Sequence, residues 1–432
     1  MALSDTNLSE LEAVAAACLV KAGLLNRNLE ASKLVNGHSK SLYQNGTELR
    51  DMRLSLFESV QNLLLMVTPP EYILTQGLSA SIMDLTALRY INRFSVAKGV
   101  PADEKISYEA LAQKVGTDES QMKRVLRYAM TKGIFVEVDG GVAHSETSLL
   151  LLQDGIATLS RYSSDRGWPI ASRFNDAIEK WGHGSPEPNE TAFNLFKNTD
   201  LPMFEYHEQH PEFGADFHAV MNQFTKSPPL SHQHIKSAYE WSSLSHTTIA
   251  DVGGSLGHAS IAILETNPSL TCIVQDLPKT VAQATNPSTS IVPAHMKSRI
   301  SFQEHSFWDP QPVVADIYFL RMIFHDWADK YAKKILQALL VAMKPGSKLL
   351  IMDYVTLPYG NLKIGDERRM RIRDMQMMVM HNALERDEGE WRRLFAETDS
   401  RLKLIKIRKP TGSALSLLEV VLEERRDSVL QS

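Results

Sequence analysis

IADVGGSLGHAS, residues 249–260, is the stretch of sequence that decides the fold. Its apolar start predicts a buried strand, and the residues after it predict a glycine turn followed by a helix. Gly253, Gly254 and Gly257 lack the side chains that would keep a ligand away from the backbone at the start of that helix. Tight strand-to-helix turns also need glycine for steric reasons, so the turn alone does not identify a ligand.

The next predicted strand, residues 270–276, ends in a carboxylate. Asp276 lies 19 positions after Gly257 (276 − 257), where an α/β nucleotide site places the acid that holds the ribose hydroxyls. The glycine turn and the acid together predict a nucleoside cofactor. At this point they leave open which nucleoside it is.

The composition excludes several classes of protein. With 432 residues and a net charge of −5, the chain has room for two or three domains and no general attraction to nucleic acid or an anionic membrane. Cys18 and Cys272 are too few for a disulfide framework or a C-x-x-C metal site, which favours a reducing compartment. Residues 1–5 lack a signal-peptide pattern, and no stretch reaches the roughly 18 to 20 apolar residues of a membrane span. We therefore expect a cytoplasmic protein.

The periodicity of the apolar residues divides the chain into three predicted regions. Residues 1–150 carry apolar helical stripes suited to packing against a second subunit, and residues 151–245 are helical and rich in aromatic side chains. From residue 246 to residue 432 strands and helices alternate, which predicts an α/β domain with a mostly parallel sheet of seven strands. The strands are expected near residues 248–252, 271–275, 300–304, 317–322, 348–353, 402–408 and 417–422, the last two as an antiparallel pair at one edge.

Residues 106–144 are typical of a helix-turn-helix with a wing. Ser107 is expected to cap a helix over residues 108–115, and a second helix is expected over residues 120–132. Four basic residues on the second helix raise the possibility of DNA binding: Lys123, Arg124, Arg127 and Lys132. No basic tail or wider basic surface accompanies them, so a structural or dimerisation role is favoured and no nucleic-acid partner is expected.

Acid and base residues follow the later predicted strands. His325 and Asp326 follow the fourth strand, Asp353 ends the fifth, and Glu385 follows a helix predicted from Arg369 to about residue 384. In such a sheet ligands bind beyond the carboxyl ends of the strands, which brings His325 and Asp326 close to the glycine turn. A histidine beside carboxylates is suited to act as a general base, because they orient its ring and stabilise its cationic form.

The whole chain resembles the class I S-adenosylmethionine-dependent O-methyltransferases of the plant and fungal small-molecule type. The resemblance rests on the residue groups 251–254 with Gly257, 275–278, 319–321, 325–327, 344–346 and 385–386, and it extends to residues 126–130 and 133–135 of the winged region. It implies a Rossmann-like methyltransferase domain over residues 246–432, a dimerisation domain over residues 1–150, and a substrate-pocket region over residues 151–245. It also implies S-adenosylmethionine as cofactor and a homodimer.

The resemblance implies a role for individual residues. His325 corresponds to the base that removes the acceptor's proton, with the acids Asp326, Asp353 and Glu385 around it. Met221, Met378 and Asn382 fall where the family grips a flat acceptor, and no metal is expected. The cofactor-binding residues implied are Asp251, Gly253, Gly254, Gly257, Asp276, Leu277, Ser306, Phe307 and Arg321.

Three positions depart from the family pattern. Ser306 stands where an aspartate is usual, Asp353 where many members have a longer glutamate, and Ser255-Leu256 where a third glycine and a small residue are common. Methyl transfer to a hydroxyl of a small secondary metabolite is the favoured function, because His325 and its acids are all present. The alternative is a pericyclase on the same fold, which binds S-adenosylmethionine without consuming it. A transcription factor and an inactive scaffold are less favoured.

Overall fold

The computed structural model describes residues 5–36 and 47–424, so the pattern considered for residues 1–4 lies outside the described residues. The contacts divide the chain into two compact units. The first contains residues 1–168 and 358–372, and the second contains residues 169–357 and 373–432. The three-region division expected from the sequence stays a prediction.

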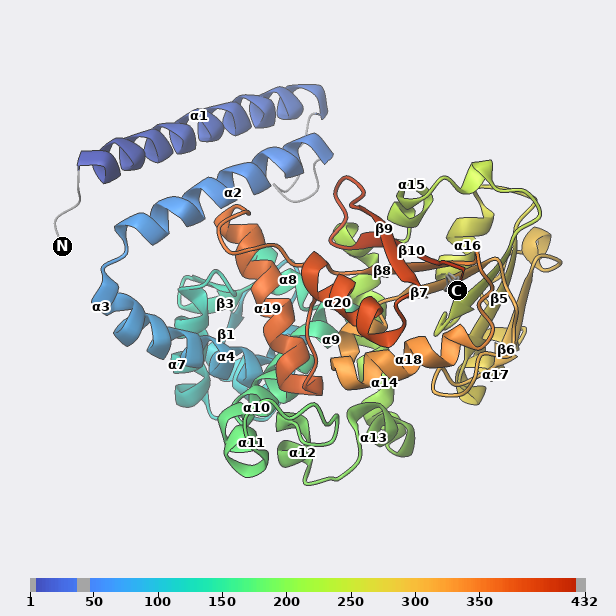
Figure 1. The fold of residues 1–432 in the computed structure, drawn as a ribbon. Helices are drawn as coiled ribbons and strands as arrows, with labels where there is room; N and C mark the ends of the chain where they lie inside the picture. The colour runs from blue at the N-terminus through green and yellow to red at the C-terminus, as the bar shows by residue number, and fades with distance from the viewer. Residues whose placement is uncertain (1–4, 37–46, 425–432) are drawn as a thin grey trace, which may run out of the picture. The chain divides into compact units, whose positions relative to one another are not determined.

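Two long helices begin the first unit. α1 (Asp5–Asn36) and α2 (Thr47–Val67) lie side by side (Figure 1). α2 ends just before Pro69, because proline cannot continue a helix. α2 leaves several large apolar side chains exposed, among them Phe57 and Leu64. The chain continues through α3 (Pro70–Tyr72), the π-helical turn Ile73–Gly77, α4 (Leu78–Arg93) and α5 (Val96–Gly99).

The predicted winged helix is present. Ser107 Oγ accepts a hydrogen bond from the Ala110 N–H at 3.1 Å, which caps α6 (Tyr108–Val115) as expected. α7 (Glu119–Met130) begins one residue before the predicted start and ends two residues before the predicted end, because Asp118 is the cap and accepts from the Gln121 N–H. β1 (Ile106–Ser107), β2 (Val136–Val138) and β3 (Gly141–Ala143) form a small antiparallel sheet in the order β1-β3-β2.

Acidic side chains pair with two of the four basic residues of the winged region. Arg127 makes two hydrogen bonds of 2.8 Å with Glu137, and Lys132 Nζ lies 2.8 Å from Asp84 Oδ2. Lys123 Nζ lies 5.1 Å from the centre of the Tyr108 ring. These contacts give three of the four basic residues partners within the fold, which is consistent with a structural role for the winged region.

Short helices connect the winged region to the large sheet. In the first unit these are α8 (Glu146–Leu150), α9 (Asp154–Tyr162) and the π-helical turn Ser163–Gly167. The following helices are α10 (Trp168–Ala171), α11 (Phe174–Trp181), α12 (Ala192–Lys197), α13 (Met203–Gln209), α14 (Pro211–Lys226) and α15 (Gln233–Ala238), with short 3-10 turns at Pro228–Leu230 and Trp241–Ser243.

The second unit contains the predicted sheet of seven strands in the order β6-β5-β4-β7-β8-β10-β9. Five strands are parallel, and β10 pairs antiparallel with both β8 and β9, which confirms the antiparallel edge. The strands are β4 (Thr248–Val252), β5 (Thr271–Asp276), β6 (Ile300–Glu304), β7 (Ile317–Arg321), β8 (Lys348–Asp353), β9 (Leu402–Arg408) and β10 (Ser416–Leu422). Each lies within one residue of its predicted bounds.

Helices cover both faces of this sheet. α18 (Asp329–Leu340) and α20 (Glu388–Thr398) pack on one face, and α15 and α16 (His258–Leu264) pack on the other. Alternate residues of a strand enter opposite cores, so Tyr318 faces α18 whereas Phe319 faces α16. Burial on both faces explains why the central strands are almost entirely apolar in sequence. The other helices of this part are α17 (Pro278–Thr285) and the 3-10 turn Ala294–Met296.

β4 and β7 are neighbours in the sheet, although β5 and β6 lie between them in sequence. From β4 the chain builds β5 and β6 toward one edge, and from β7 it builds β8 toward the other. α/β sheets bind ligands where the strand order reverses, so a ligand is expected in the region beyond the carboxyl ends of β4 and β7, which we call the crevice. Among the described residues no helix has the length and apolarity to cross a membrane.

Candidate active site

The glycine turn after β4 is fixed by its neighbours. The N–H groups of Gly253 and Gly254 donate to the carbonyl of Gln275 at 2.8 and 3.2 Å, which ties the turn to β5. A Cβ on Gly254 would lie 2.6 Å from the Asp251 carboxylate carbon, so no side chain fits there. Gly253 has φ +72°, and Ser255 has φ 53° in the left-handed region, where glycine is favoured. The turn therefore keeps its shape although a serine replaces the family's third glycine.

Asp276 lies beside this turn at the end of β5. Its Oδ2 accepts from the Ser255 N–H at 2.9 Å and its Oδ1 from the Leu277 N–H at 2.8 Å. Each carboxylate oxygen keeps a further lone pair for a ligand hydroxyl. The predicted ribose-binding acid is thus oriented against the glycine turn before any ligand arrives. Leu277 is 40% exposed beside it.

Asp251 has a different place from the other predicted cofactor residues. It is 1% exposed, and its Oδ2 accepts from Ser260 Oγ on α16 at 2.7 Å. Burial raises the pKa of Asp251 to about 6. The carboxylate therefore joins β4 to α16, which shapes the turn, and its direct contact with a cofactor stays a prediction.

Arg321, Phe307 and Ser306 surround the crevice from the neighbouring strands. Arg321 ends β7, and its Nη2 donates to the Leu230 carbonyl at 2.7 Å, while its Nε is buried without a hydrogen-bond partner. A Cβ on Gly253 would lie 4.0 Å from the Phe307 ring, so this ring adjoins the turn. Ser306 Oγ accepts from the Trp308 N–H at 3.4 Å. A glycine turn, an acid oriented beside it and a half-buried arginine with an unpartnered Nε–H fit a nucleoside that carries an anionic group.

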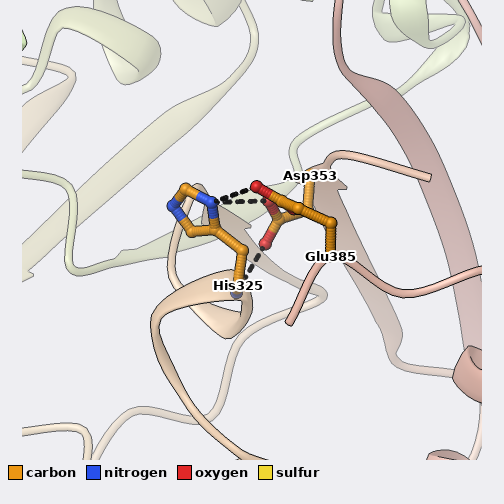
Figure 2. Close-up of side chains that lie close together, drawn as sticks. All are labelled: His325, Asp353 and Glu385. Carbon is orange, nitrogen blue, oxygen red and sulfur yellow. Dashed lines mark hydrogen bonds and ion pairs between the residues drawn. The ribbon is translucent and has the colours of Figure 1, made fainter. Parts of the chain in front are cut away.

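His325 lies on a 3-10 turn, Phe324–Asp326, just after β7. Its Nδ1 is 3.0 Å from Glu385 Oε1 and 3.8 Å from Asp353 Oδ1, and Figure 2 shows both carboxylates on this side of the ring. The other ring nitrogen, Nε2, is 3.6 Å from Asp326 Oδ1. The structure thus brings together all four predicted catalytic residues.

Asp353 holds the backbone of His325 more closely than its ring. Its Oδ2 accepts from the His325 N–H at 3.2 Å, whereas Glu385 makes the hydrogen bond to the imidazole (Figure 2). Because Asp353 is one methylene shorter than the family's usual glutamate, the division of roles is clear: Asp353 fixes the turn, and Glu385 orients the ring. The Glu385 N–H in turn donates to Asp374 Oδ1 at 3.0 Å.

Burial and nearby charges oppose each other at His325. Burial lowers the pKa of the imidazole, but the charges of Asp326, Asp353 and Glu385 raise it more, to about 10. Burial also raises the pKa of Asp353 to about 6. The carboxylates therefore make His325 a strong base whose cationic form is stabilised.

Arg386, to which the resemblance assigns no role, holds the turn that carries His325. Its Nη1 donates to the Phe324 carbonyl at 2.9 Å and its Nη2 to the Trp327 carbonyl at 2.7 Å, and its Nε donates to Asp329. Its side chain is fully buried. Adjacent residues of one segment thus hold His325: Glu385 by its ring and Arg386 by its turn.

His381 is a further site residue that the sequence analysis did not single out. It ends α19 (Ile364–His381), and its Nε2 lies 3.8 Å from Asp326 Oδ1, so Asp326 stands between two histidines. The Phe204 ring stacks on His381 with centroids 5.3 Å apart. Burial lowers the pKa of His381, so it is mostly neutral near pH 7. Only its nearness in sequence to Asn382 could have suggested it.

α19 begins before its predicted start at Arg369 and ends at His381, short of the predicted end near residue 384. The helix stops there because Asn382 takes a left-handed conformation with φ 52°. The Asn382 amide donates to the carbonyls of Glu187 and Glu190, which fixes that loop. Met378 is 37% exposed on α19, and Met221 is half-buried on α14. Acceptor contacts of these three residues stay a prediction.

The fold also brings together donors that could hold a metal ion. One donor atom each of His325, Asp353 and Glu385 lies within 4.8 Å of the others. The sequence analysis found no such cluster because the three residues follow different elements. That the reaction needs no metal stays a prediction.

Two regions of the chain match known protein families. Residues 183–399 match the family model of the O-methyltransferase domain, and residues 77–154 match that of the O-methyltransferase dimerisation domain. The O-methyltransferase bik3 of Gibberella fujikuroi is 36% identical over 380 residues, which cover 86% of this chain and 81% of that protein.

Two solved structures share the fold across nearly the whole chain. OxaC superposes with a TM-score of 0.74 at 20% identity, and the match covers 96% of this chain and 100% of OxaC. A protein described as a pericyclic reaction enzyme superposes with a TM-score of 0.71 at 23% identity, covering 95% of this chain and 100% of that one. The family-model matches and the 36% identity to bik3 decide the assignment. The chain belongs to the family of S-adenosylmethionine-dependent O-methyltransferases and includes that family's dimerisation domain.

Proposed function

We propose that this enzyme methylates a hydroxyl group of a small aromatic or polyketide-type secondary metabolite, with His325 as the general base. The observation that carries the proposal is the buried His325, whose Nδ1 is held by Glu385 at 3.0 Å while Asp353 fixes its backbone. His325 follows β7, the sheet neighbour of β4, after which the proposed nucleoside site begins. The 36% identity to a protein named as an O-methyltransferase supports the reaction type.

The chain's residues divide the work of the reaction. His325 in its neutral form accepts the proton of the acceptor hydroxyl, and Glu385 stabilises the imidazolium that results. A conjugate-acid pKa of about 10 is close to the pKa of a phenol, about 10, so this proton transfer is nearly balanced. Phe204 and Trp327, with ring centroids 6.0 Å apart, add apolar surface near the base. S-adenosylmethionine supplies the methyl group that the resulting oxygen anion receives.

The residues proposed to hold the cofactor are those of the crevice. Gly253 and Gly254 let the turn pack closely against Ile323 and Asp251, and Asp276 offers its carboxylate to the ribose hydroxyls. Phe307 adjoins Gly253, where its ring can contact the nucleoside, and Arg321 supplies a cation. Alignment of the reacting groups in a dry pocket contributes most to such a displacement.

We also propose that the enzyme is a homodimer. The match of residues 77–154 to the dimerisation domain supports it, as do exposed apolar side chains on the helices of this region, including Leu78, Ile82 and Met83. Light scattering at micromolar concentration tests it, and a monomer there would contradict it.

Mass spectrometry tests the proposed reaction. The protein is incubated with S-adenosylmethionine and phenolic, polyketide and pyridone acceptors, and both product mass and S-adenosylhomocysteine are followed. A product heavier by one methylene with an equal amount of S-adenosylhomocysteine supports methyl transfer. In the variant His325→Ala the rate should fall by about two to four orders of magnitude. An unchanged rate would contradict the role of His325.

A pericyclase activity is the second candidate, and one observation favours it. Carboxylate oxygens of Asp326, Asp353 and Glu385 lie 3.0–3.8 Å from the His325 ring nitrogens and raise its pKa to about 10, which favours a protonated ring that can act as a hydrogen-bond donor. An isomerised or dehydrated product, with the cofactor unconsumed, would establish this second function in the same experiment.

A further inference from the structure

Arg321 is a cation without a counter-ion at the crevice. Its Nη2 donates to the Leu230 carbonyl and its Nε is buried without a partner, and within residues 5–36 and 47–424 it forms no ion pair. Burial lowers the pKa of Arg321. Arg321 is half-buried, and burying even its Nε–H without a partner is costly, so the arrangement points to an anionic ligand.

Two histidines lie beside this arginine. The rings of His232 and His258 stack with centroids 5.3 Å apart and an angle of 14° between their planes. His258 directly follows Gly257 of the glycine turn. His232 comes two residues after Leu230, whose carbonyl accepts a hydrogen bond from Arg321. The stack therefore joins the glycine turn to the segment that Arg321 holds. Neither histidine has a role in the proposed reaction so far.

The surroundings of the two histidines are electropositive. Burial first, and then the charges of Arg321 and His258, lower the pKa of His232 to about 3. Burial and the charge of Arg321 also lower the pKa of His258. The charges of Asp353, Tyr354 and Asp251 act on Arg321, where they oppose the lowering of its pKa by burial. Both imidazoles are therefore mostly neutral at pH 7, with an N–H to donate and the capacity to gain a proton beside an anion.

We propose that His232, His258 and Arg321 form the subsite for the carboxylate at the amino-acid end of the cofactor. This inference rests on the proposed function, because it takes the nucleoside to be one that carries an amino acid. Asp276 is proposed to bind the ribose of the cofactor beside the same turn. The anionic group that remains for Arg321 and the two histidines is the carboxylate of the cofactor's amino-acid end. Arginine and imidazole N–H groups both make charge-assisted hydrogen bonds to carboxylates.

Calorimetry with two nucleosides tests the subsite without turnover. S-adenosylhomocysteine carries the amino-acid carboxylate, whereas 5′-methylthioadenosine has the same adenosine and sulfur without it. The variants His232→Gln and His258→Gln should each weaken S-adenosylhomocysteine binding about five- to thirtyfold and change 5′-methylthioadenosine binding less than twofold. His295→Gln is the matched control, because this histidine is exposed on the 3-10 turn Ala294–Met296 of the same unit.

The pH dependence of binding is a second measurement. A bound carboxylate favours the protonated imidazoles, so wild-type affinity for S-adenosylhomocysteine should rise as the pH falls from 8 to 6, and that for 5′-methylthioadenosine should stay constant. An affinity for S-adenosylhomocysteine that falls as the pH falls would overturn the role of the histidines.

The outcomes separate the two proposals. Equal losses for both nucleosides in the histidine variants, or no loss for either, would overturn the carboxylate subsite while the nucleoside site remains. If the wild-type protein binds neither nucleoside, the proposed function fails and the subsite fails with it. Circular dichroism and melting curves show whether each variant is folded, and His258→Gln, at the less buried of the two positions, keeps the test valid if His232→Gln does not fold.

Discussion

Glu385 Oε1 lies 3.0 Å from His325 Nδ1, whereas the nearest Asp353 oxygen lies 3.8 Å from the same nitrogen. This difference assigns the orientation of the ring to Glu385, although the two acids are similarly buried. Asp353 instead accepts the backbone N–H of His325. The two acids therefore support the base in different ways, and substitutions can separate them.

The variant Glu385→Gln should lower the methylation rate about 10- to 100-fold, because a hydrogen bond to a charged partner contributes about 1.5–3 kcal/mol. Asp353→Asn should cost less than tenfold, since the asparagine oxygen can still accept the His325 N–H. Initial rates at saturating substrate measure both effects. A larger loss in Asp353→Asn than in Glu385→Gln would show that the assignment of roles is reversed.

The pH dependence of the rate follows from the pKa of His325, which the three acids raise to about 10. Only neutral imidazole accepts a proton, so kcat/KM should rise about tenfold per pH unit between pH 7 and pH 9. Removing a carboxylate charge lowers the pKa, so the profile of Asp353→Asn should move to lower pH. If the two profiles coincide, the titrating group is not His325.

Arg386 offers a test of stability. Replacing it in Arg386→Met leaves the Phe324 and Trp327 carbonyls and Asp329 without their donor, which should lower the free energy of unfolding by about 2–5 kcal/mol. Urea denaturation measures the loss. The matched control is Arg173→Met, whose exposed pair with Asp176 should contribute less than about 1 kcal/mol. Similar losses in both variants would mean that the clamp adds nothing.

The strands and turns of the second unit could be predicted because their signals are local. The run before Gly253 is apolar since both faces of β4 are buried, and the strand bounds were predicted to within one residue. The exact end of α19 could not be predicted from local signals. It depends on Asn382, whose amide donates to the Glu187 carbonyl 195 positions earlier in the chain.

The candidate site was predictable only in part. His325 and Asp276 stand at strand ends, which sequence patterns locate. The pairing of His325 with Glu385 spans 60 positions, and that between Arg321 and the Leu230 carbonyl spans 91, so the fold alone brings these partners together. His381, His232 and His258 carry no local signal, since a histidine in a helix or loop has many structural uses. Their neighbours in space give them meaning.

One donor atom each of His325, Asp353 and Glu385 lies within 4.8 Å of the others, which is close enough to hold a metal ion. Whether the reaction needs a metal is therefore worth testing. We expect treatment with EDTA followed by desalting to leave the methylation rate unchanged, because Nδ1 is engaged with Glu385 and a proton, rather than a metal ion, balances the charge of the acids. Added Mg²⁺ or Zn²⁺ should not raise the rate of the treated enzyme. A loss of activity with EDTA that Zn²⁺ restores would show that the cluster is a metal site and that His325 is a ligand, since one nitrogen cannot both bind a metal and share a proton with Glu385.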